Sequence, residues 1–87
     1  MSLKLIISDP ERVEYASRIS DTIQNLGDSV RLADGSFVLD TKLDTSQVLT
    51  KLLRVISLED HVYVMELSRD WSGYGEVRVN NFLEGHL

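Results

Sequence analysis

The chain has 87 residues, of which 43% are hydrophobic and 26% are charged, and its formal net charge is −5. This composition is typical of one small globular domain, because a disordered chain has fewer apolar residues and a larger net charge. The sequence contains no cysteine, which excludes disulfides, thiolate nucleophiles and cysteine-based zinc sites.

The charge also limits the expected partners and location. The nine basic residues are scattered along the chain, so nucleic-acid binding would require a basic patch formed by folding or by dimerisation. The apolar run at the N-terminus is too short for a signal peptide, and no segment reaches the length of a transmembrane helix. We therefore expect a cytoplasmic protein with no membrane partner.

The first predicted elements are a strand and a helix that meet at Asp9-Pro10. Residues 3–8 are mainly apolar, as in a central strand. Proline fits in a first helical turn, so we expect Asp9 to be the N-cap of the following helix. The helix is predicted from an apolar stripe that ends before Gly27: Val13, Ala16, Ile19, Ile23 and Leu26.

A hairpin is predicted next, with Asp34-Gly35 at its turn. This pair suits a two-residue type I′ turn between strands 29–33 and 36–40. The turn predicts two cross-strand pairs that share one face of the ribbon: Leu32 with Phe37, and Val30 with Leu39. Arg31 and Val38 are then expected on the other face.

A second helix and a fourth strand complete the predicted core. Asp44 and Gln47 have the spacing of a capping box, ahead of an apolar stripe that extends to Ile56. Residues 61–67 alternate as in a strand. This order predicts an α+β domain of ferredoxin-like βαββαβ topology, in which two helices cover one face of a four-stranded antiparallel sheet.

The whole chain, residues 1–87, is interpreted as a single domain. Its core is expected over residues 2–68, followed by a C-terminal extension over residues 69–87. Within the extension, residues 76–79 alternate like a short strand, and residues 80–87 are expected to form a helical turn or an extended tail.

Several segments resemble the SinR-like proteins, small relatives of the CRISPR-associated Cas-two family. They are the first strand KLIISD, the hairpin VRLADGSFVLDT, the helix entry LDTSQVLTKLL, the strand LEDHVYVMELSRDWSG and the terminal segment FLEGHL. The resemblance covers residues 3–74 and the terminal segment. It implies a ferredoxin-like homodimer, with residues 76–79 as a fifth strand that is exchanged between protomers.

The resemblance also gives Asp9 a candidate catalytic role. In the Cas-two family the acid that ends the first strand is implicated in metal-dependent phosphodiester cleavage, together with its symmetry mate. Asp9 has the matching position and would be a ligand of Mg²⁺, which prefers carboxylate oxygens. Ser8 departs from the family pattern, in which an aromatic residue often precedes this acid. The helix cap is the simpler interpretation of Asp9, and it requires no cofactor.

The extension contains the candidate interface or ligand residues: Trp71, Tyr74, Val77 and Val79. Aromatic side chains stack on the bases of single strands, but they also anchor protein interfaces. Arg69 and Arg78 are the only basic residues close in sequence to these aromatic residues, where they could contact phosphates. A dimer or other protein contact is therefore favoured over nucleic acid.

No group of residues has the spacing of a catalytic site, and His61 and His86 are interpreted as ordinary surface histidines. The leading hypothesis is a non-catalytic interaction or regulatory homodimer. Its contact surface is expected on the helix-free face of the sheet: Ile6, Val38, Tyr63 and Met65. One alternative is a Mg²⁺-dependent nuclease for RNA or DNA that uses Asp9 from both protomers. Another is a small inhibitor that blocks a nucleic-acid enzyme through its acidic surface.

Overall fold

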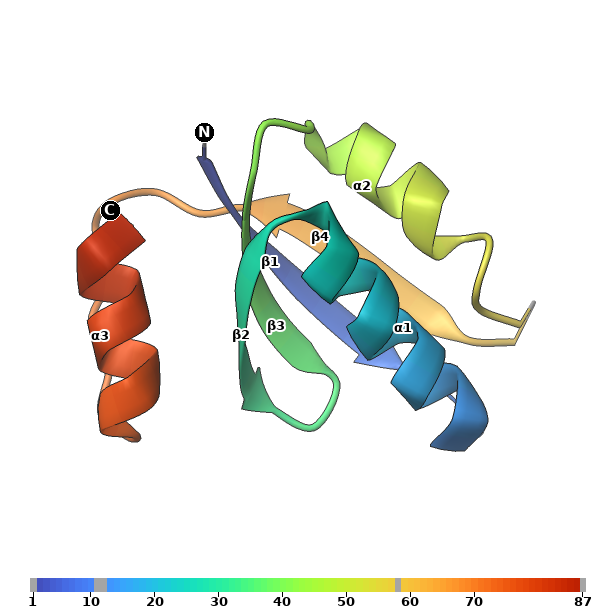
Figure 1. The fold of residues 1–87 in the computed structure, drawn as a ribbon, viewed down its shortest axis with the longest axis horizontal. Coiled ribbons are helices and arrows are strands. Elements are labelled where there is room, and N and C mark those ends of the chain that lie inside the picture. Colours follow the sequence, from blue (N-terminus) through green and yellow to red (C-terminus); the bar gives the residue numbers. More distant parts are fainter. Residues whose placement is uncertain (1, 11–12, 58, 87) are drawn as a thin grey trace.

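The computed structural model describes residues 2–10, 13–57 and 59–86. They form four strands and three helices (Figure 1): β1 (Ser2–Asp9), α1 (Val13–Leu26), β2 (Asp28–Ala33), β3 (Ser36–Thr41), α2 (Thr45–Leu52), β4 (His61–Glu66) and α3 (Val77–His86). No helix in this part of the chain is both long and apolar enough to cross a membrane.

The four strands form one antiparallel sheet with the order β2-β3-β1-β4. The central strand β1 pairs with β3 over residues 2–7 and with β4 over residues 4–9. The predicted α+β class and the four-stranded antiparallel sheet are therefore confirmed. This strand order is compatible with a ferredoxin-like arrangement.

Helices α1 and α2 cover one face of the sheet, and α3 lies against the other face (Figure 1). The core between the sheet and the first two helices contains seven buried side chains: Ile6, Ile19, Ile23, Phe37, Leu39, Val48 and Leu52. The prediction that Ile6 lies on the helix-free face is wrong. Because side chains alternate along β1, Ile6 lies on the α1–α2 face, whereas Leu5 and Ile7 lie on the opposite face.

The β2–β3 hairpin has the predicted two-residue turn but a different register. Ala33 pairs with Ser36 across Asp34-Gly35. Of the two turn residues only Gly35 has a positive φ, 78°, so the turn is not type I′, which requires a positive φ at both. The register then shifts at a β-bulge between Arg31 and Ala33. The bulge adds local twist next to a turn that lacks the twist of type I′.

The bulge separates side chains that were predicted to share one face. Arg31 pairs with Phe37, and Val30 pairs with Val38, so both predicted pairs, Leu32 with Phe37 and Val30 with Leu39, are wrong. Phe37 and Leu39 lie in the core under α1 and α2. A second core forms under α3 from four buried side chains: Leu3, Val30, Val38 and Leu83.

The C-terminal extension forms a helix where a strand was predicted. Residues 77–79 are the first turn of α3, so the predicted strand over residues 76–79 is wrong. The side chains that bring α3 onto the sheet have helical spacing: Val79, Phe82, Leu83 and His86. This helical spacing gives more apolar contact with the sheet than the short alternation around Val77 would give. The Val77 side chain is 71% exposed.

The start of α2 confirms the predicted capping box. The Asp44 Oδ1 atom accepts a hydrogen bond from the Gln47 backbone N–H at 2.8 Å. The Asp44 backbone N–H donates to Gln47 Oε1 at 2.9 Å. These bonds satisfy backbone N–H groups that have no partner inside the helix.

Candidate functional site

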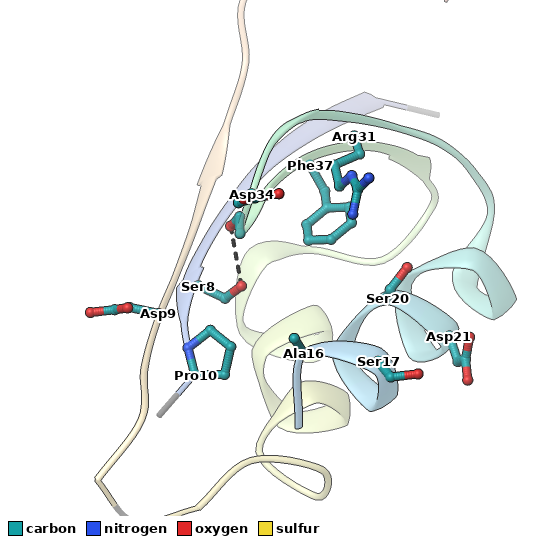
Figure 2. Close-up of a pocket in the computed structure, with 11 residues that line it drawn as sticks. Ser8, Asp9, Pro10, Ala16, Ser17, Ser20, Asp21, Arg31, Asp34 and Phe37 are labelled. Atoms are coloured by element: carbon teal, nitrogen blue, oxygen red, sulfur yellow. Dashed lines mark hydrogen bonds between the residues drawn. The ribbon is translucent and has the colours of Figure 1, made fainter. Parts of the chain in front are cut away.

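Asp9 is the last residue of β1 and lies opposite His61 at the start of β4. Its side chain is exposed and borders a shallow depression together with Pro10, Glu59 and His61. Asp9 also lines the edge of a cleft between α1 and the β2–β3 hairpin, and in Figure 2 its carboxylate points out of this cleft. The alternation along β1 places Asp9 on the same face as Ile7.

The sequence offers two interpretations of Asp9, a ligand of Mg²⁺ and the N-cap of the first helix. Within residues 2–10, 13–57 and 59–86, no group of three or more His, Asp or Glu side chains is arranged to hold a metal ion. The predicted cap would bond to the N–H groups of residues 11 and 12, which lie outside the described residues.

A cleft of about 620 Å³ with polar and apolar lining lies between α1 and the β2–β3 hairpin (Figure 2). Ser17, Ser20 and Asp21 line it from α1, and Arg31, Asp34 and Phe37 line it from the hairpin. The Ser8 hydroxyl donates to the Gly35 carbonyl at 3.1 Å, which holds the hairpin tip against β1. The described residues that line this cleft include three serines, Ser8, Ser17 and Ser20, and no histidine.

The structure brings three of the four candidate residues in the extension together. Trp71, Tyr74 and Val79 line an apolar cavity of about 300 Å³ between the sheet, α3 and the loop before it. Trp71 and Val79 are half-buried and pack against the second core, whereas Tyr74 is fully exposed at the rim. Val77 does not line this cavity.

Two cross-strand pairs leave apolar side chains exposed next to this cavity. Leu5 pairs with Met65 and Ile7 pairs with Tyr63, on the sheet face opposite α1 and α2. The exposed fractions of Ile7, Tyr63 and Met65 are 41%, 64% and 45%. We call these four residues the open strip. Leu5 also lines the apolar cavity, so the two apolar surfaces are continuous.

The open strip corrects the predicted contact surface. Tyr63 and Met65 were predicted on a helix-free face; both lie opposite α1 and α2, on a face that α3 covers in part. Val38 lies on this face but is buried beneath α3, at 1% exposure. Ile7 was missed, although the spacing of Leu3, Leu5 and Ile7 was a usable signal. The nearly continuous apolar run of β1 hid this signal.

Two polar contacts stabilise the fold around these surfaces. Lys4 is 2% exposed, and its ammonium group donates to Glu66 Oε1 at 2.8 Å and to the Ser2 hydroxyl. Hydrogen bonds from Lys4 and Ser2, together with the charge of Lys4, lower the pKa of Glu66. His86 is not the ordinary surface residue that was predicted, because it lies 2.7 Å from an Asp40 oxygen and stacks on Phe82.

The fold and these surfaces define a small α+β domain with an apolar face that is covered only in part. No protein-family model, no curated protein and no solved structure gives a match to this chain. The likeness to the SinR-like and Cas-two families therefore remains a prediction from the sequence segments.

Proposed function

We propose that the protein is a non-catalytic interaction or regulatory module of the SinR-like type, built as a ferredoxin-like homodimer whose protomers meet at the open strip. The observation that carries this proposal is the exposure of Ile7, Tyr63 and Met65 side by side on neighbouring strands. Contiguous exposed apolar side chains mark interaction surfaces in small proteins.

The arrangement of the elements supports a ferredoxin-like fold. The first six elements follow the order β1-α1-β2-β3-α2-β4, and both helices of this series lie on one side of the sheet. In this proposal α3 is an addition that covers β2, β3 and part of β1. The β1–β4 side of the same face is then left for a partner.

Burial of the open strip would give a second copy a favourable interface. Full burial of an Ile, Met or Tyr side chain contributes roughly 1.5–3 kcal/mol, and these side chains are already about half-buried. A two-fold axis would double each contribution, because the same residues are buried in both protomers. A chain of this size gains stability from such an extension of its core.

Sedimentation velocity at micromolar concentrations tests the homodimer. We expect the wild type to sediment as a dimer, and Tyr63→Glu and Met65→Glu to sediment as monomers that keep the wild-type circular dichroism spectrum. The matched control is Val77→Glu, because Val77 is also exposed but lies outside the open strip. A monomeric wild type, or a Val77→Glu variant that dissociates equally, would contradict the proposal.

One observation favours the nuclease as a second candidate. Asp9 follows Ile7 on the same face of β1, so it continues the open strip at one end. A dimer formed through this strip would place a carboxylate from each protomer at its interface. Two such carboxylates are able to share a divalent cation when they lie close together.

A further inference from the structure

A second cleft, of about 440 Å³ and mainly polar, lies at the β2 edge of the sheet, the edge opposite β4. Its polar lining comes from three elements: Ser20 and Gln24 of α1, Ser29 and Arg31 of β2, and Arg78 of α3. Among the described residues, none of those that line this cleft carries a carboxylate, although the chain contains 14 acidic residues and has a net charge of −5. The cleft is therefore a local site of positive charge on an acidic protein.

The position of Arg78 is fixed by the β2 edge. One guanidinium nitrogen, Nη2, donates to the Arg31 backbone carbonyl at 3.1 Å and to Glu76 Oε2 at 3.3 Å. The first of these bonds satisfies a backbone carbonyl of the edge strand β2. It also brings together an arginine of the sheet and an arginine of α3. Its length shows that Arg78 lies directly beside the Arg31 backbone.

The Arg31 guanidinium has no ion-pair partner among the described residues. Arg31 and Phe37 are cross-strand partners, so both side chains lie on the α1 side of the sheet. In Figure 2 the Arg31 side chain extends beside the Phe37 ring, across the cleft from Ser20. Ser20, Arg31 and Phe37 line both this cleft and the larger one next to it, so the two form one continuous groove.

We propose that the cleft between Arg31 and Arg78 binds the phosphate group of a small phosphomonoester, a sugar phosphate or a nucleoside monophosphate. A guanidinium presents several N–H donors in a planar fork that matches phosphate oxygens, and two guanidinium groups balance a phosphate dianion. The hydroxyls of Ser20 and Ser29 and the Gln24 amide provide further hydrogen bonds to the same group.

The adjoining cleft favours a small ligand over a nucleic acid. Asp21 and Asp34 line the groove beyond Arg31, where they would repel the next phosphates of a polynucleotide. The same carboxylates accept hydrogen bonds from the hydroxyl or amino groups of a sugar or nucleoside. One end of the groove therefore has hydrogen-bond donors for a phosphate group. The other end has hydrogen-bond acceptors for the sugar or nucleoside part of the ligand.

Glu76 is the group that competes with the phosphate. Its ion pair with Arg78 is exposed, since the two side chains are 67% and 57% accessible. Exposed pairs of this kind are weak, so a phosphate dianion is expected to displace or share this contact easily. Replacement of Glu76 by glutamine should then strengthen phosphate binding.

Titration of the ¹⁵N-labelled protein with inorganic phosphate, ribose 5-phosphate, AMP and adenosine tests the proposal by NMR. The phosphate-bearing probes should shift the amide signals of Ser20, Ser29 and Arg31, and adenosine should not. The Arg31→Gln variant is expected to bind about tenfold more weakly, because it loses a charge-assisted contact. Comparison of AMP with ribose 5-phosphate distinguishes a nucleotide from a sugar phosphate.

Two further variants make the result specific. Arg54→Gln is the matched control, because Arg54 is exposed after α2 and lines neither cleft, and its affinity should equal that of the wild type. Glu76→Gln should bind more tightly than the wild type. Three results would overturn the proposal: no shift with any phosphate probe, equal affinity in Arg31→Gln, or tighter binding of a single-stranded oligonucleotide than of AMP.

Discussion

The Nδ1 atom of His86 lies 2.7 Å from Oδ2 of Asp40, and this contact holds the last turn of α3 to β3. The His86 ring also stacks on Phe82, with ring centroids 4.1 Å apart. One histidine therefore links the terminal helix to the sheet by both a polar and an apolar contact. The helix encloses the second core through Leu83.

We predict that His86→Ala destabilises the protein by about 1–2 kcal/mol, because it removes a partly buried hydrogen bond and a ring contact. The loss should appear in urea unfolding and as faster amide hydrogen exchange in α3 than in β1. Glu84→Ala is the matched control on the exposed side of the same helix, and it should behave like the wild type. Equal stability of the two variants would show that the contact does not hold α3.

The length of α3 and its position were not predictable from local alternation. Residues 76–79 read alone as a strand, whereas the spacing of Val79, Phe82 and Leu83 indicates a helix only when the longer segment is considered. The second core under α3 depends in addition on the bulge before Ala33, which moves Val30 out of the predicted face. A bulge of this kind depends on turn geometry, and the Asp34-Gly35 pair did not specify it.

Other features were predicted correctly because their signals are local. The α1 stripe places Ile19 and Ile23 in the core, and Asp44 with Gln47 caps α2. The hydrogen bond from Arg78 to the Arg31 carbonyl had no such local signal, because 47 positions separate the two residues. Only the docking of α3 beside β2 brings these two arginines to one cleft.

Stability should depend on pH through two exposed carboxylates. Hydrogen bonds from Lys4 and Ser2 lower the pKa of Glu66 from 4.5, and the Gln47 backbone N–H lowers the pKa of Asp44 from 3.8. A carboxylate whose pKa is lower in the folded state stabilises the fold at pH values above its unfolded pKa. This contribution is lost as the pH falls through the folded value.

We therefore expect the urea midpoint to be nearly constant from neutral pH to about pH 5 and to fall below that. Glu66→Gln should lower the midpoint at neutral pH and reduce its decrease on acidification. Salt should weaken the Glu66 contribution, because this side chain is 62% exposed. A Glu66→Gln variant with the same pH profile as the wild type would rule out this source of the dependence.

Two glycine substitutions, at the hairpin tip and in α3, should have opposite effects on stability. Gly35 has a φ of 78°, and a Cβ atom there would collide with the Ser8 carbonyl oxygen, so Gly35→Ala should destabilise the fold by more than about 1 kcal/mol. Gly85 lies in α3, where a Cβ atom would extend into open space, so Gly85→Ala should stabilise that helix by up to about 1 kcal/mol. Thermal unfolding of both variants measures the difference, and equal melting temperatures would contradict it.

Asp9 gives the clearest separation between a binding module and a nuclease. Asparagine is as good a helix cap as aspartate but is a much poorer Mg²⁺ ligand, so Asp9→Asn should keep the wild-type stability under either interpretation. For the proposed non-catalytic module, we expect that the wild type with Mg²⁺ cleaves RNA and DNA no faster than Asp9→Asn does. Asp34→Asn is the control, because Asp34 lies in the turn of the β2–β3 hairpin, and in Figure 2 the Asp9 carboxylate points away from it. Mg²⁺-dependent cleavage that is present in the wild type and in Asp34→Asn, but absent in Asp9→Asn, would instead establish the nuclease.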